Sequence, residues 1–129
     1  MNVLMVLLLL WMGVGEPIDV ADQLETVVHE QIADPVQRWR PLVEEHFPAE
    51  EVETALCIIG HESGGNPRAD NPRSSASGLF QVLGSLWAPK FGVTRDQLFD
   101  PELNTRLASE IWEQQGWWAW SPYQRGSCR

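Results

Sequence analysis

An apolar stripe in the middle of the chain ends in a carboxylate. Four residues follow the i, i+3, i+4, i+7 spacing of a helix face that packs on a core: Val52, Ala55, Leu56 and Ile59. The next position on this face is Glu62. Pro48 suits the start of such a helix, and Gly64 suits its C-terminal cap. The sequence therefore predicts a core helix that carries one acidic side chain on its inward line.

The surroundings expected for Glu62 change its acidity. Apolar neighbours and the negative end of the helix dipole both disfavour a charged carboxyl group, so both raise its pKa. A carboxyl group that keeps its proton near neutral pH can donate it to a leaving-group oxygen, as glycoside cleavage requires. From the stripe alone, the alternative stays open that Glu62 reaches solvent or pairs with Arg68 or Arg73.

The rest of the chain is predicted to be helical almost throughout, without strands. Apolar spacing and capping residues predict further helices over residues 19–33, 35–46, 79–89 and 101–115. Pro41 lies inside the second of these and can end it early. Residues 63–77 are so rich in Gly, Asn, Pro and Ser that we expect a structured loop without regular elements. The predicted fold class is mainly α.

The last predicted helix carries one polar residue on its apolar face, and an irregular tail follows it. Asn104 shares that face with Leu107 and Ile111, so its side chain is expected to point inward and to anchor the loop by hydrogen bonds. The tail contains the run WWAWSPY.

The N-terminus begins with an uncharged stretch. Residues 3–15 form an unbroken run of apolar residues and glycine, and as a helix they would span about 20 Å, less than the roughly 30 Å of a membrane core. This length suits a signal peptide better than a membrane span, and Gly13 and Gly15 suit cleavage before Glu16. An uncleaved short anchor and a hairpin buried in an assembly stay as alternatives. We expect a secreted or cell-wall-associated protein.

The net charge of −9 is confined to one part of the chain. Residues 16–53 hold eleven acids and two bases, whereas residues 54–129 hold equal numbers of both. The charge argues against binding to nucleic acid or to anionic lipid. We expect the acidic helices to face away from any glycan groove and to serve solubility or a partner.

The two cysteines fit an exported chain. Cys57 and Cys128 could form one disulfide, or they could be two unrelated buried thiols. No histidine or cysteine cluster has the spacing of metal ligands, because three histidines (His29, His46 and His61) and both cysteines are far apart in the sequence. Neither a metal nor a cofactor is expected.

Three sequence blocks occur in a fixed order: HESGGNP at residues 61–67, ASGLFQ at 76–81 and DPELN at 100–104. Together they resemble the lytic transglycosylase family with the goose-type lysozyme-like fold, over roughly residues 38–123. The flanking tryptophans are similar to those of small exported or phage-encoded wall-lytic domains. The resemblance implies a lysozyme-like helical domain over residues 38–129, with the long loop at the active-site groove and an acidic helical extension over residues 16–37.

The resemblance also implies roles for single residues. Glu62 would be the general acid and base, Ser63 would orient it or contact the substrate, and Gln81 would line the groove. The substrate would be peptidoglycan, cleaved at the β-1,4 bond between N-acetylmuramic acid and N-acetylglucosamine by a monomer. In transglycosylases the substrate N-acetyl group assists, and the 6-hydroxyl closes a 1,6-anhydro product. If the enzyme hydrolyses instead, Asp70 is the candidate second carboxylate, and a turn-forming role is its alternative.

The sequence departs from the family pattern near its end. The A-Y-N-x-G block of the family is replaced by WWAWSPY, in which Tyr123 could supply the aromatic hydroxyl and Trp120 could stack on a sugar. Thr105 stands where a larger aliphatic residue is common, and His61 is expected to face solvent. Two other classes stay open: a non-catalytic glycan-binding or virion and wall-assembly module, and a structural protein that binds a partner through its acidic helices.

Overall fold

Helices dominate the part of the chain that the computed structural model describes, which is residues 20–23 and 34–129. The chain divides into two units, residues 1–32 and 33–129. In the first, residues 20–23 are helical and exposed, and the remainder of the predicted helix 19–33 and the whole apolar run 3–15 lie outside the described residues. None of the described helices is long and apolar enough to cross a membrane.

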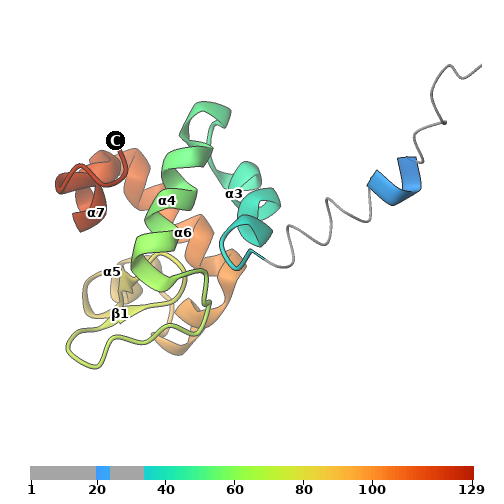
Figure 1. Ribbon diagram of the computed structural model, residues 1–129. Helices are drawn as coiled ribbons and strands as arrows, with labels where there is room; N and C mark the ends of the chain where they lie inside the picture. The colour runs from blue at the N-terminus through green and yellow to red at the C-terminus, as the bar shows by residue number, and fades with distance from the viewer. Residues whose placement is uncertain (1–19, 24–33) are drawn as a thin grey trace, which may run out of the picture. The chain divides into compact units, whose positions relative to one another are not determined.

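The second unit is built around one central helix. Its α-helices are α3 (Arg40–His46), α4 (Val52–Ser63), α5 (Gly84–Phe91), α6 (Pro101–Gln115) and α7 (Ser121–Gln124). Short 3₁₀ turns connect them: η1 (Gln37–Trp39), η2 (Ala49–Glu51), η3 (Asp96–Phe99) and η4 (Gly116–Ala119). Helix α4 lies between α3 and α7, and α6 also packs on α3 (Figure 1). The predicted mainly helical fold is confirmed.

The apolar face of α4 is buried, as expected from the sequence. All four stripe residues are at most 3% exposed. Gly64 ends the helix with a left-handed φ of 62°, and its N–H donates to Ile59 O and Gly60 O at 3.1 and 3.2 Å. The start comes later than predicted, because Pro48 precedes the 3₁₀ turn η2 rather than the α-helix itself.

The predicted helix over residues 79–89 is wrong in its first half. Strands β1 (Ala76–Ser77) and β2 (Val82–Leu83) pair as an antiparallel hairpin, and α5 begins only at Gly84. Leu83 and Leu86 are 44% and 45% exposed, so the apolar spacing did not mark a buried helix face. The loop 63–77 therefore contains a strand, contrary to the prediction.

A buried side chain explains this hairpin. Asn104 of α6 is fully buried, and its Nδ2 donates to Ser77 O and Leu98 O at 2.9 Å each. Its Oδ1 accepts from the N–H of Phe80, also at 2.9 Å. These bonds satisfy backbone groups that a helix would have paired internally. The prediction that Asn104 anchors the loop is confirmed, as is α6 itself, which is capped by the side chain of Asp100.

Two further expectations need correction. Pro41 does not end a helix but lies in the first turn of α3, where a missing N–H costs nothing. The aromatic tail is not irregular, because it forms η4 and α7. Trp117 fixes this segment, since its Nε1 donates to Glu51 Oε2 at 2.7 Å. Glu51, one acid of the N-terminal surplus, therefore points inward, whereas the other acids of that surplus that the structure describes are exposed.

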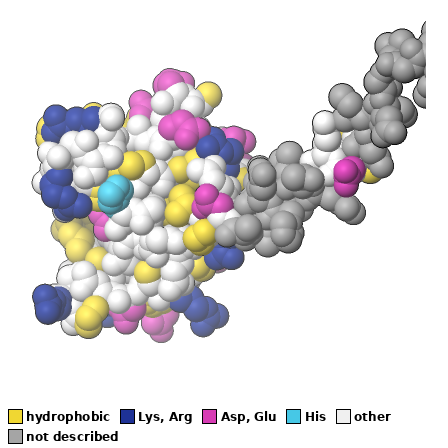
Figure 2. Space-filling view, viewed as in Figure 1, with side chains coloured by type: hydrophobic (Ala, Val, Ile, Leu, Met, Phe, Trp, Pro, Cys, Tyr) yellow, Lys and Arg dark blue, Asp and Glu magenta, His cyan; other side chains and the backbone are white. Residues whose placement is uncertain are grey.

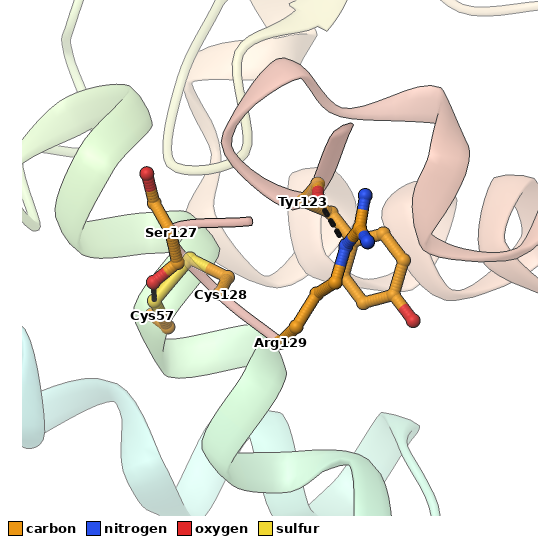
Figure 3. The surroundings of a disulfide bond; sticks show 5 residues. All are labelled: Cys57, Tyr123, Ser127, Cys128 and Arg129. Carbon is orange, nitrogen blue, oxygen red and sulfur yellow. Dashed lines mark hydrogen bonds between the residues drawn. A yellow bond between two sulfur atoms is a disulfide. The ribbon is translucent and has the colours of Figure 1, made fainter. Parts of the chain in front are cut away.

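A disulfide ties α4 to the C-terminal segment. Cys57 and Cys128 are bonded, with their Cα atoms 5.6 Å apart, and neither is a free thiol (Figure 3). The predicted disulfide is thus present. It lies five residues before Glu62 on the same helix, so it joins the helix that carries the carboxylate to the chain beyond α7.

Candidate active site

A cavity of about 210 Å³ opens beside the last turn of α4. Its walls come from α4, the β-hairpin, α5, α6, η4 and the start of α7. The described residues that line it are Glu62, Ala76, Gln81, Val82, Leu83, Trp87, Ile111, Ala119, Trp120 and Ser121. Glu62 is the one ionisable group among these lining residues, so an acid stands in a mostly apolar wall.

Burial sets the acidity of Glu62. The side chain is half-buried, and burial raises its pKa above the ordinary value of 4.5, in the direction expected from the sequence. The positive charge of Arg125 acts in the opposite sense and lowers the same pKa. Among the described residues the ion pairs are Arg40–Glu53 and Arg95–Asp70, so neither Arg68 nor Arg73 pairs with Glu62.

Gln81 lines the cavity with an unusual backbone. It has a positive φ of 51°, which no other described residue except glycine shares. Its Nε2 donates to Ala69 O and Gly78 O at 3.0 Å each, so both amide hydrogens are used to hold the loop. The Oε1 atom therefore remains as the acceptor that this side chain can offer to a ligand.

Trp120 is both core and cavity wall. It is 5% exposed, its Nε1 donates to Phe80 O at 2.9 Å, and its ring lies 5.5 Å from that of Trp117. Trp87 of α5 also lines the cavity, and sequence reasoning missed it. The apolar spacing at Leu79, Val82, Leu83 and Leu86 does not include Trp87, so it gives no signal for this residue.

Two predicted substrate contacts do not line this cavity. The Ser63 hydroxyl donates to Ile59 O and accepts from the Gly65 N–H, both at 3.2 Å, so it completes the end of α4. Tyr123 packs its ring edge-on against Trp118 at 5.4 Å, and its backbone O accepts a hydrogen bond from Arg129 Nε at 3.1 Å (Figure 3). Their roles toward a substrate remain predictions without a place in the cavity.

Asp70 belongs to a different hollow. It is exposed, and its Oδ1 accepts from Arg95 Nη2 at 2.7 Å. This second hollow is lined by Asp70 together with Arg68, Asp96, Phe99 and Asp100. The structure therefore does not bring Asp70 to the cavity of Glu62.

The fold brings together two groups of potential metal ligands within the described part of the chain. Their donor atoms lie within 4.8 Å of one another: Cys57, His61 and Cys128 in one group, and Glu45, His46 and Glu102 in the other. Distance in the sequence therefore does not keep these donor atoms apart in the fold, and the absence of a bound metal stays a prediction. In the first group the two sulfurs are bonded to each other, so His61, which is exposed as predicted, is the remaining donor there.

Comparison with known proteins gives one match. The family model described as the transglycosylase SLT domain matches residues 44–115, more than half of the chain. Comparison with curated proteins and with solved structures gave no match. The matched span includes Glu62, Gln81 and Asn104, whereas Trp120 lies beyond it.

Proposed function

The chain belongs to the transglycosylase SLT domain family, and from this premise we propose that Glu62 cleaves the β-1,4 bond between N-acetylmuramic acid and N-acetylglucosamine in bacterial peptidoglycan. The domain itself indicates a lytic transglycosylase activity on the cell wall, outside the cytoplasm. One observation carries the assignment of Glu62: it is the ionisable group in the wall of the cavity, and burial raises its pKa.

The first step uses Glu62 as an acid. Its protonated carboxyl group donates a proton to the glycosidic oxygen while the bond from that oxygen to C1 of N-acetylmuramic acid breaks. The carbonyl oxygen of the substrate N-acetyl group attacks C1 from the other side and forms a cyclic oxazolinium ion. The N-acetylglucosamine end leaves with the proton as a free hydroxyl.

The second step uses Glu62 as a base. The carboxylate removes the proton of the 6-hydroxyl, O6 attacks C1, and the oxazolinium ring reopens to give the 1,6-anhydro product. This route needs one carboxylate, which fits a cavity with Glu62 as its sole ionisable lining residue among those described. The hydrolytic alternative with Asp70 is less well supported, because Asp70 pairs with Arg95 at another hollow.

The other lining residues suit the binding of a sugar. Trp120 and Trp87 offer apolar ring surface, and Gln81 offers Oε1 as a hydrogen-bond acceptor for a hydroxyl or amide group. Since Gln81 is held to the loop through both amide hydrogens, its acceptor is fixed before the substrate arrives.

Digestion of purified peptidoglycan tests this proposal. Glu62→Gln should reduce fragment release by about 10²- to 10⁴-fold, because a positioned general acid contributes that much. Glu113→Gln is the matched control, since Glu113 is exposed and does not line the cavity. Undiminished release by Glu62→Gln would remove Glu62 as the acid. Binding of glycan by the wild type without any release would favour a non-catalytic module.

Mass analysis of the fragments decides the reaction type. Products with 1,6-anhydro ends identify a transglycosylase, whereas reducing ends identify a hydrolase. In the second case Asp70→Asn becomes the informative variant, and loss of activity in it would restore Asp70 as a base.

We further propose that the protein is exported as a monomer, with residues 1–15 as a signal peptide or short anchor ahead of the acidic extension 16–37 and the catalytic domain 38–129. N-terminal sequencing of the protein recovered outside the cell is the test. A new terminus at Glu16 is expected after cleavage, and an intact Met1 would contradict processing.

A further inference from the structure

One arginine near the cavity has a guanidinium group that makes no hydrogen bond or ion pair with the described residues. Arg125 follows α7, and its backbone N–H donates to Ser121 O at 3.0 Å. Ser121 lines the cavity of Glu62, so Arg125 lies one helical turn from a wall residue and on the same face of that turn. Within the described part of the chain its side chain is exposed and has no hydrogen bond or ion pair, although its charge acts on Glu62.

The guanidinium group of the other arginine in this segment, Arg129, is engaged in contacts within the protein. Arg129 donates to Tyr123 O and Gln124 O at 3.1 and 3.0 Å, and its guanidinium lies over the Trp118 ring at 4.8 Å. Basic side chains gather over this C-terminal end of the molecule in Figure 2. Of the two guanidinium groups, that of Arg125 is therefore the one left to meet a ligand.

The backbone that carries Arg125 is held firmly. The disulfide fixes Cys128 to α4, and Gln124 Nε2 donates to Trp118 O at 2.7 Å. The Ser127 N–H also donates to Pro122 O at 2.9 Å, which closes the chain around Arg125. A cation whose fixed backbone lies one helical turn from a residue of the cavity wall is suited to an anionic substrate group.

We propose that Arg125 binds a carboxylate carried by the N-acetylmuramic acid unit of the glycan, either its lactyl carboxylate or one on its peptide stem; this inference rests on the proposed function. Guanidinium groups pair with carboxylates through two parallel hydrogen bonds, which fix orientation as well as charge. Arg125 would thus distinguish the muramic acid sugar from the neutral N-acetylglucosamine that alternates with it.

Such a contact also couples substrate binding to the acid. In the free protein the positive charge of Arg125 lowers the pKa of Glu62, against the effect of burial. When a substrate carboxylate neutralises Arg125, that opposing influence is removed, so Glu62 keeps its proton to a higher pH. The same contact that selects the sugar would then favour the protonated form of the acid.

Titration of an inactive variant tests the contact without turnover. Glu62→Gln is titrated by tryptophan fluorescence with four probes: stem-free glycan fragments with free lactyl carboxylates, the same fragments after amidation, stem-bearing fragments, and neutral chitin oligosaccharides. Adding Arg125→Gln should weaken binding of the carboxylated fragments by about 10- to 100-fold, the range expected for a hydrogen bond to a charged group. Binding of the amidated and neutral probes should change by less than about twofold.

The matched control is Arg106→Gln in the same background, since Arg106 is exposed on α6 and does not line the cavity. The two carboxylated probes distinguish the lactyl group from the stem as the source of the anion. An equal loss for charged and neutral probes would overturn the inference and make Arg125 structural. If wild type cleaved peptidoglycan but Arg125→Gln bound every probe normally, the inference alone would fail. If no probe bound and no glycan were cleaved, the proposed function would fail with it.

Discussion

The Oδ1 atom of Asn104 accepts a hydrogen bond from the backbone N–H of Phe80 at 2.9 Å, and both residues are fully buried. Phe80 directly precedes Gln81, the residue with positive φ in the cavity wall. One side chain on α6 therefore fixes the turn from which Gln81 meets the site. The turn is tight enough that a Cβ on Gly78 would overlap Leu98 O and the Asn104 amide.

Asn104→Leu should lower the free energy of unfolding by about 3 kcal/mol or more. The substitution keeps a similar volume but leaves Phe80 N–H, Ser77 O and Leu98 O buried without their partner, at about 1–3 kcal/mol each. Urea unfolding measures the change. Gln114→Leu at an exposed position of the same helix should stay within about 0.5 kcal/mol of wild type. Equal stability of the two variants would show that Asn104 does not hold the hairpin.

The neighbouring Thr105 offers a stabilising change. It is fully buried, and within the described part of the chain its Oγ1 has no hydrogen-bond partner. Thr105→Val removes this unsatisfied hydroxyl and keeps the shape, so the free energy of unfolding should rise by about 1 kcal/mol. The control is Ser109→Ala, whose buried hydroxyl donates to Arg106 O at 2.6 Å and should give no gain. A less stable Thr105→Val variant in urea would contradict the prediction.

The parts of the fold that could be predicted are those with local signals. Helices α4 and α6 carry both an apolar period and recognisable ends, Gly64 for the first and Asp100 for the second. The β-hairpin carries no such signal, because two-residue strands are too short to show alternation. It exists because Asn104 and Trp120 bond the turn at Phe80 from 24 and 40 residues away.

The candidate site also contains residues that local sequence signals predict correctly and residues that they misplace. The apolar stripe predicts that Glu62 points inward, and two other predicted site residues, Gln81 and Trp120, line the same cavity. Ser63 points elsewhere because its side chain lies about 100° around the helix from Glu62, where it bonds the helix end. Asp70 lies at another hollow, where it pairs with Arg95, a residue 25 positions later in the sequence. Such distant pairings leave no mark in local spacing.

Removal of the disulfide should cost about 4 kcal/mol of unfolding free energy, because the bond closes a long loop between residues 71 positions apart. Cys57→Ala combined with Cys128→Ala tests this in urea, with the reduced wild type beside it. A reducing agent should destabilise the wild type and leave the double variant unchanged. If the double variant were as stable as the oxidised wild type, the bond would contribute nothing to the fold.

The raised pKa of Glu62 makes the stability of the protein depend on pH in a defined direction. Burial raises the folded-state pKa above the ordinary value of 4.5, so folding favours the protonated carboxyl group. The stability gained from protonation is fully present below pH 4.5 and is lost as the pH rises through the folded pKa. Wild type and Glu62→Gln should therefore differ in a way that changes with pH.

Glu62→Gln cannot ionise, so relative to wild type it should become more stable as the pH rises from 4 to 8, whatever fixed difference the substitution itself introduces. In a protein that keeps Glu62, Arg125→Gln should increase the stability lost between pH 4 and pH 8. The substitution removes the positive charge that lowers the pKa of Glu62. The measurement is urea unfolding at several pH values, with Glu113→Gln as the control for the loss of an exposed carboxylate. A difference between wild type and Glu62→Gln that is constant over this range would contradict the raised pKa. If Glu62→Gln instead became more stable relative to wild type as the pH falls, the folded state would favour the carboxylate, and Glu62 would then be a poor general acid at neutral pH.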